Sequence, residues 1–166
     1  MTQQTDPLSD LCFEDARKRL EDTTLELSRR LSQAIPRLGQ IPWRYEKLHV
    51  KVCVPDDDGR RRRRGHGPRY KADVRLTRDD VEVGWELFQR FAAEQGLPVK
   101  RVTDYEADYD QYFFEARDEQ TQDQVRLLID LPGEWNIPHA AIGVWVGPRF
   151  RRDTPPAEEP STDPAD

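Results

Sequence analysis

The densest group of charged side chains in the sequence is a run of five arginines that follows three consecutive aspartates. The run comprises Arg60, Arg61, Arg62, Arg63 and Arg64. Guanidinium groups bind phosphates and carboxylates through paired hydrogen bonds, so the run could contact a nucleic acid or an acidic protein. The adjacent aspartates, the lack of interleaved aromatic residues and the formal net charge of −6 argue against nucleic acid. We interpret the run as the solvent-exposed tip of a hairpin that is available for protein contact.

A second group combines a thiol with an imidazole. Cys53 and His49 lie four residues apart in an alternating segment, so they project from the same side of a strand, with Lys51 between them. A cationic neighbour would favour the thiolate, which is the nucleophilic form. Along a strand, however, four residues span about 13 Å, which is too far for a hydrogen bond. We therefore favour a packing role for Cys53, and an enzyme with a Cys53/His49 site stays an alternative.

A third group is a row of acidic residues in the segment TDYEADYD. The row consists of Asp104, Glu106, Asp108 and Asp110. In an extended strand these side chains would share one face, and rows of carboxylate oxygens can bind Mg²⁺ or Ca²⁺. The row can instead be a solvated strand end whose charge prevents edge pairing, and we favour this interpretation. Because no established ligand spacing is matched, the sequence predicts no metal site, no cofactor and no catalytic residue.

An amphipathic helix is predicted for residues 6–35. Its apolar residues recur at intervals of three and four, which places them on one face. These residues are Phe13, Ala16, Leu20, Leu27, Leu31 and Ala34, with Thr24 in the gap of the stripe. Asp6, followed by Pro7, or else Ser9, is suited to cap the start of the helix, and Pro36 ends it.

A second helix is predicted after Thr77, which is spaced from Asp80 as in a capping box. Its apolar face is formed by Val81, Trp85, Phe88 and either Phe91 or Ala92. Gly96 is suited to the left-handed conformation that commonly ends a helix, and Pro98 prevents continuation.

Six further segments alternate between apolar and polar residues with the period of a strand. They span residues 43–54, 69–76, 99–104, 109–118, 124–131 and 141–147. Short links favour antiparallel neighbours, and the first two segments can pair as a hairpin around the arginine run. The predicted fold is therefore α+β. We expect a two-layer sandwich with a mostly antiparallel sheet of five or six strands and two amphipathic helices, in the order α-β-β-α-β-β-β(-β).

Several aromatic residues fall outside the registers that point toward the predicted core. They are Trp43, Phe113, Trp135 and Trp145. If both faces of the sheet carry aromatic residues, the second face needs a cover. Either the first helix or a partner chain could cover it, and we favour the helix.

The composition indicates a soluble protein with a small core. Charged residues make up 35% of the chain and hydrophobic residues 36%, and no stretch resembles a secretion signal or a membrane span. We therefore expect a cytoplasmic protein without membrane contact. The expected organisation is a disordered N-terminus at residues 1–5, one domain at residues 6–150, and a disordered acidic, proline-rich tail at residues 151–166.

The order of segments resembles that of small lipoprotein-type α+β domains of high-GC bacteria. The resemblance covers residues 10–148 and lies in an amphipathic helix, the strand WRYEKLHVKVCV, a hairpin, the helix around GWELFQRF and the final strand AAIGVWVGP. The chain departs from that pattern because it lacks a signal peptide and a lipobox cysteine. The resemblance implies a fold and carries over no catalytic residue.

The missing catalytic constellation and the surface aromatic residues predict a non-enzymatic protein-interaction module. Its partner would be another protein or a second copy of the chain, bound through the surface aromatics and the arginine-rich tip. A nucleic-acid-binding accessory protein that uses the arginines is the alternative. An enzyme with a site at Cys53 and His49, or at the acidic row, is the second alternative.

Overall fold

The computed structural model describes residues 11–47, 51–55, 61–102, 110–134 and 136–152. Within them the chain forms three helices: α1 (Phe13–Ala34), α2 (Pro36–Gly39) and α3 (Arg78–Glu94). It also forms eight strands, which are β1 (Arg44–Glu46), β2 (Lys51–Pro55), β3 (Arg61–His66), β4 (Arg69–Ala72), β5 (Val99–Val102), β6 (Gln111–Arg117), β7 (Gln124–Asp130) and β8 (His139–Arg149).

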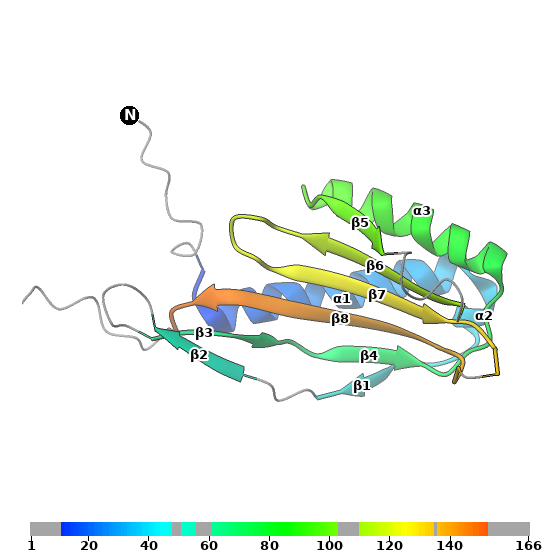
Figure 1. The fold of residues 1–166 in the computed structure, drawn as a ribbon, viewed down its shortest axis with the longest axis horizontal. Helices are drawn as coiled ribbons and strands as arrows, with labels where there is room; N and C mark the ends of the chain where they lie inside the picture. Colours follow the sequence, from blue (N-terminus) through cyan, green and yellow to red (C-terminus); the bar gives the residue numbers. More distant parts are fainter. Residues whose placement is uncertain (1–10, 48–50, 56–60, 103–109, 135, 153–166) are drawn as a thin grey trace, which may run out of the picture.

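All eight strands belong to one sheet, and every pair of neighbours is antiparallel. The main order is β1-β4-β8-β7-β6-β5, and β3 pairs with both β2 and β8 (Figure 1). The predicted α+β sandwich is confirmed. Each of the six predicted segments contains strand; the sheet reaches eight strands because segment 43–54 contains both β1 and β2, and the arginine run forms β3.

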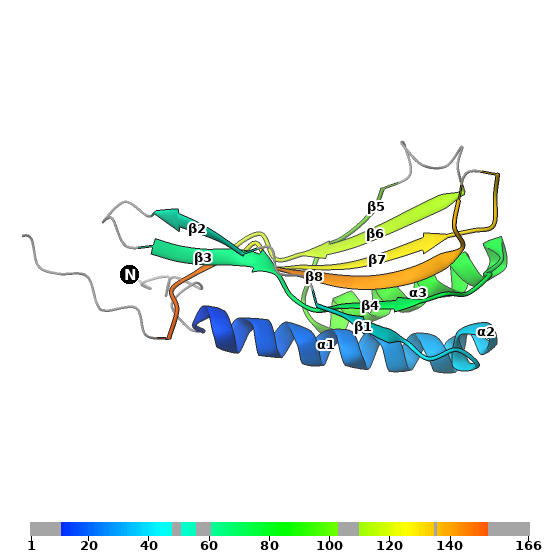
Figure 2. The same cartoon turned by 90° about the horizontal axis from the view of Figure 1, so that it is seen from below.

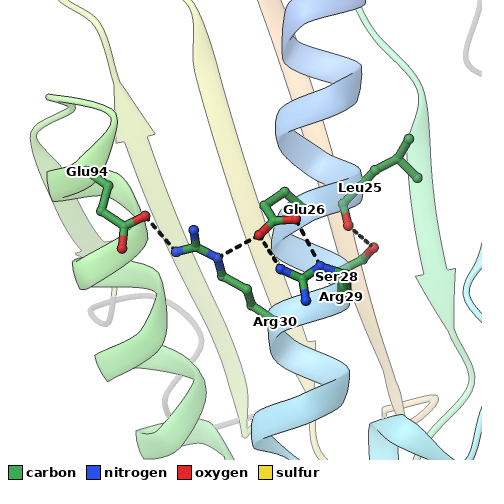
Figure 3. Close-up of polar contacts among 6 residues, drawn as sticks. All are labelled: Leu25, Glu26, Ser28, Arg29, Arg30 and Glu94. Atoms are coloured by element: carbon green, nitrogen blue, oxygen red, sulfur yellow. Dashed lines mark hydrogen bonds and ion pairs between the residues drawn. The ribbon is translucent and has the colours of Figure 1, made fainter.

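Both long helices pack on the same face of the sheet (Figure 2). They are linked by an ion pair of 2.6 Å between Arg30 Nη1 and Glu94 Oε2 (Figure 3). The guanidinium carbon of Arg30 also lies 5.3 Å from the centre of the Phe91 ring of α3. The expectation that helix 1 covers the second face is therefore wrong. A helix with one apolar stripe buries the most apolar surface when it joins the existing core. None of the described helices lies on the opposite face of the sheet.

The hydrophobic core lies between the helices and the sheet. Phe13, Leu27 and Leu31 of α1 are buried in one cluster with Phe88 of α3 and Phe114 of β6. Thr24, which interrupts the apolar stripe, is fully buried. Its hydroxyl is satisfied there, because it donates to the carbonyl oxygen of Glu21 at 2.6 Å. The stripe predicted from sequence is thus the buried face of α1.

The ends of the helices follow the sequence only in part. The capping box of α3 is confirmed: the Thr77 hydroxyl accepts from the backbone nitrogen of Asp80, and the Asp80 carboxylate accepts from that of Thr77. Gly96 has the left-handed conformation, with a φ of 70°. Helix α1 begins at Phe13 after Cys12 as N-cap, and the predicted caps Asp6 and Ser9 lie outside the described residues.

The hairpin around the arginine run is longer than predicted, and the arginines are not its tip. β1 pairs with β4 and β2 pairs with β3, so Arg61 to Arg64 lie in a strand that has neighbours on both sides. Residues 56–60, which connect β2 with β3, lie outside the described residues. The sequence places the run at a tip because it lies between two segments that are predicted to pair, but Arg61–Arg64 themselves form part of β3 and pair with β2 and β8.

No described helix is both long enough and apolar enough to cross a membrane. The predicted disordered ends are residues 1–5 and 151–166. Residues 1–5 and 153–166 lie outside the part of the chain that the structure describes. Residues 151 and 152 are described, and Arg152 Nη2 forms an ion pair of 2.6 Å with Asp15 of α1.

Candidate functional site

The sheet face opposite the helices, called here the open face, carries the side chains that alternate with the core. Among the described residues, the basic side chains on this face outnumber the acidic ones, although the whole chain has a net charge of −6. From register and alternation, the basic residues are Arg44, Arg62, Arg64, Arg69, Lys71, Lys100, Arg117 and Arg126. The acidic residues are Glu46, Asp73, Glu115 and Asp130. The open face is therefore locally positive.

A hollow of about 150 Å³ lies near the middle of the open face. Its floor is apolar, and its rim carries two arginines and a histidine. The residues around the hollow are His66, Arg69, Phe113, Arg126, Leu128, Ala141, Gly143, Val144 and Trp145. Such a mixture of apolar surface and a few converging polar groups is typical of binding sites.

Side chains of β3 and β4, which both pair with β8, meet at the hollow because the pairing with β8 changes register between them. His66 pairs with Trp145 of β8, whereas Tyr70 pairs with Ile142, so the register shifts by one residue at Gly67 and Pro68. Strict alternation would put His66 and Arg69 on opposite faces, but this shift brings both side chains to the hollow. Gly67 is needed there because a Cβ atom would lie 2.3 Å from a methyl carbon of Val144.

Arg126 is held at the rim by its own strand. Its Nε donates to Oε1 of Gln124 at 2.9 Å, Nη2 contacts the same oxygen, and its guanidinium carbon lies 5.7 Å from the centre of the Phe113 ring. Glu115 is directly opposite Arg126 in the register, yet the two form no ion pair within 4 Å. The guanidinium charge therefore stays available at the hollow.

Aromatic rings form one side of the hollow. His66 and Trp145 pack edge to face with ring centres 4.7 Å apart, and the guanidinium carbon of Arg64 lies 5.9 Å from the centre of the Trp145 ring. Burial lowers the pKa of His66, and the positive charges of Arg126 and Arg69 lower it further. His66 is thus neutral near pH 7 and contributes an aromatic edge rather than a charge.

Gly143 makes room for the hollow. It lies in the middle of β8, opposite Arg126 of β7, and a Cβ atom added to it would meet no atom within 4 Å. Glycine inside a strand costs roughly 0.5–1 kcal/mol relative to alanine. The missing side chain of Gly143 leaves open space between Ala141 and Trp145. No neighbouring atom is so close that only glycine would fit at this position.

A polar group lies farther along the open face, where β6, β7 and β8 run together. Asp130 is 5% exposed, its Oδ2 lies 3.4 Å from Nδ1 of His139, and Nε2 of Gln111 donates to the same oxygen at 3.4 Å. His139 Nδ1 also lies 2.8 Å from the carbonyl oxygen of Ile137, so this nitrogen carries a hydrogen. Burial raises the pKa of Asp130, while the charge of His139 opposes that rise.

The predicted arginine site is divided between two faces. Arg64 lies on the open face beside Trp145, and the Arg62 guanidinium carbon lies 4.0 Å from the Phe150 ring centre. Arg63 points to the helix side, 5.9 Å from the ring of Phe13. Arg60 and the side chain of Arg61 lie outside the described residues. The arginines therefore form no single cationic tip among the described residues.

The predicted aromatic site is also divided. Phe113 and Trp145 both line the hollow. Trp43 instead packs against the core, and its indole Nε1 donates to the Ser32 hydroxyl of α1 at 2.8 Å. Trp135 lies outside the described residues. Two of the four predicted aromatic residues thus come together on the open face.

Most of the residues proposed for an enzyme site lie outside the part of the chain that the structure describes. His49, the side chain of Cys53, and Asp104, Glu106 and Asp108 all lie outside it. Asp110 is described and forms an ion pair with Arg78 at 2.9 Å. No group of three His, Cys, Asp or Glu side chains suited to a metal ion occurs among the described residues.

Sequence reasoning missed most of the rim and the floor. The sequence does not predict His66, Arg69, Arg126, Leu128 and Gly143 as binding residues, because they lie on four separate strands, β3, β4, β7 and β8. Gly143 was the one available signal, because a glycine in the centre of an otherwise apolar strand marks a bulge or a close approach.

Comparison of the chain with protein-family models, curated proteins and solved structures found no match.

Proposed function

We propose that the protein is a non-enzymatic binding module that holds an acidic partner protein on the open face of its sheet. The single observation that carries this proposal is the hollow, in which an apolar floor is surrounded by arginines on a chain whose net charge is negative. A cytoplasmic location and the resemblance to lipoprotein-type domains stay predictions.

Charge supports an acidic partner. Among the described residues, no carboxylate lies within 4 Å of the charged groups of Arg64, Lys71 or Arg126, and Arg69 is 3.6 Å from its partner Glu46. Complementary charges across an interface speed association and exclude partners of the wrong sign. A partner with carboxylates facing these groups would supply the missing counter-charges.

The open face also suits a protein better than a nucleic acid. Its aromatic rings lie in a hollow and against one another rather than as a row of exposed platforms for bases, and the negative net charge repels a polyanion. Nucleic-acid binding through the arginines remains the alternative, and the experiment below includes it.

The test compares two pairs of charge-neutralising substitutions. Arg64→Gln with Lys71→Gln changes the open face, whereas Arg19→Gln with Arg90→Gln removes the same charge from the helices. We call the first pair the open-face variant and the second pair the helix variant. We expect a purified partner protein of acidic isoelectric point to bind the wild type and the helix variant, and to bind the open-face variant more weakly. Equal loss in both variants, or no loss in either, would contradict the proposal.

Fluorescent duplex and single-stranded oligonucleotides are titrated with the same proteins at two salt concentrations. We expect no binding at physiological salt. Micromolar binding that weakens with a log-log slope of about −0.9 per phosphate contact on duplex DNA, and that is lost only in the open-face variant, would favour the nucleic-acid alternative.

A further inference from the structure

The hollow has the size and lining of a pocket for one apolar side chain. A dry cavity of about 150 Å³ lined by apolar residues is large enough to hold benzene. The hollow on the open face has a similar volume, and Phe113, Leu128 and Trp145 supply its apolar surface. A leucine, isoleucine or phenylalanine side chain therefore fits the volume above Gly143.

The cations around the hollow determine what must flank that side chain. Arg69 and Arg126 line the hollow, and Arg64 lies against Trp145 at its side. A guanidinium that is only partly exposed forms its strongest interactions with a carboxylate that can bind two of its nitrogens. An apolar anchor with carboxylates on both sides would satisfy the floor and the rim together.

The length of the basic surface favours a chain segment over a small aromatic acid. Arg62, Arg64, Arg69 and Lys71 follow one another along β3 and β4 on the open face. The first and the last lie nine positions apart in nearly extended chain, which corresponds to at most about 30 Å. A small acid would occupy the hollow alone, whereas an extended segment of about nine residues could reach all four cations.

From this geometry, and on the basis of the proposed function, we infer that the hollow receives a single apolar side chain from an extended, acidic segment of the partner protein. Asp or Glu residues on either side of this anchor pair with the arginines of the rim. The apolar floor sets which residue is accepted at the anchor position, and the cations set the charge of its neighbours.

The inference is tested with Gly143→Val, which fills the hollow from below. Because a Cβ at this position meets no atom within 4 Å and Val is favourable in strands, the variant should fold normally. Gly133→Val is the matched control: this exposed glycine lies outside the hollow, and an added Cβ would make ordinary contact with Asn136 at 3.5 Å. Thermal unfolding of both variants verifies that they are folded.

Three sets of nine-residue fluorescent peptides serve as probes, and their binding is measured by anisotropy. One set has Asp and Glu flanks with a central Leu, Ile or Phe; a second has the same flanks with a central Ser; a third has Gln flanks with a central Leu or Phe. We expect the first set to bind best. Replacing its anchor with Ser, or filling the hollow by Gly143→Val, should weaken binding about 10- to 100-fold, and Gly133→Val should not.

The outcomes separate this inference from the proposed function. Acidic peptides could bind regardless of the central residue and bind Gly143→Val equally well. This result would agree with the proposed docking of acidic partners on the open face, but it would overturn the inference that an apolar side chain enters the hollow. No binding by any acidic peptide would overturn both. Binding of free benzoate or phenylacetate that is lost in Gly143→Val, without binding of the peptides, would identify a small acid as the ligand and would also overturn the inference.

Discussion

Two consecutive residues of β6 show how different the two faces of the sheet are. Phe114 faces the helices, is fully buried, and has ring centres of Trp85 and Phe88 within 4.8 and 6.0 Å of its own. Phe113 faces the other way, is half-buried, and has a guanidinium group beside its ring. The helix face thus uses aromatic residues as packing, whereas the open face leaves one beside a hollow.

Charged residues differ between the faces in the same way. On the helix side, Arg149 is 3% exposed and forms two hydrogen bonds with the Asp123 carboxylate, at 2.6 and 2.8 Å. On the open face, Arg126 lies opposite Glu115 and yet bonds to a neutral amide. The buried pair of Arg149 and Asp123 indicates a contribution to stability. Arg126, which has no carboxylate beside it among the described residues, keeps its charge available at the hollow.

The strongest way to break this comparison is to truncate each phenylalanine. Phe114→Ala removes a fully buried ring from the core and should lower the free energy of unfolding by about 3–5 kcal/mol. Phe113→Ala should lower it by less than about 1 kcal/mol, because this ring lies at the surface of a hollow. Urea denaturation of both variants measures the difference. Similar losses would show that the open face contributes to the core as much as the helix face.

A second prediction concerns the buried ion pair. Asp123→Ala leaves the Arg149 guanidinium buried without its carboxylate, and should cost about 3 kcal/mol or more of unfolding free energy. The double variant Asp123→Ala with Arg149→Met should recover part of that loss, since it removes the unpaired charge. Chemical denaturation of the two variants checks this, and an equal or larger loss in the double variant would contradict it.

The same substitution at two glycines sharpens the contrast in filled volume. In α3, a Cβ on Gly84 would already contact Ile129 at 3.4 Å, so Gly84→Val overfills the core and should cost roughly 1–3 kcal/mol. Gly143→Val enters empty space and should be neutral or stabilise the strand by up to about 1 kcal/mol. Melting temperatures of the two variants should therefore move in different directions or by clearly different amounts.

The smallest expected effect lies on the exposed surface of α1. Hydrogen bonds from Arg29 and Arg30 lower the pKa of Glu26 to about 2 (Figure 3). Because the folded-state pKa lies below the usual glutamate value of 4.5, the interaction of Glu26 with the two arginines stabilises the fold above pH 4.5, and this contribution is lost as the pH falls toward 2. The effect is small because the pair is exposed to solvent.

Carbon-detected NMR titration of the Glu26 carboxyl group measures its pKa directly. Glu26→Gln should remove that portion of the acid-dependent loss of stability between pH 4.5 and 2 and leave the remainder unchanged. A Glu26 titration midpoint near 4.5 would show that the arginines do not hold the carboxylate in solution.

The sequence predicted the elements of the site better than the site itself. Phe113 and Trp145 could be recognised because alternation put them out of phase with the core residues beside them. The position predicted for the arginine run was wrong. Its charge and its neighbouring glycines suggested a loop, but Arg61–Arg64 lie in β3, which pairs with β8. Trp43 shows the same limit, because its partner Ser32 belongs to a helix eleven residues earlier.

By itself, the sequence determined the helices and most of the strands, because apolar periodicity, the Thr77 capping box and Gly96 act between residues a few positions apart. Only the tertiary structure decided that both long helices share one face and that none of the described helices covers the other. It also decided the hollow, since the register shift at Gly67 and Pro68 and the pairing of β7 with β8 bring His66, Arg126 and Trp145 together. These three side chains lie on strands that are far apart in the sequence, so their meeting depends on the strand order of the whole sheet.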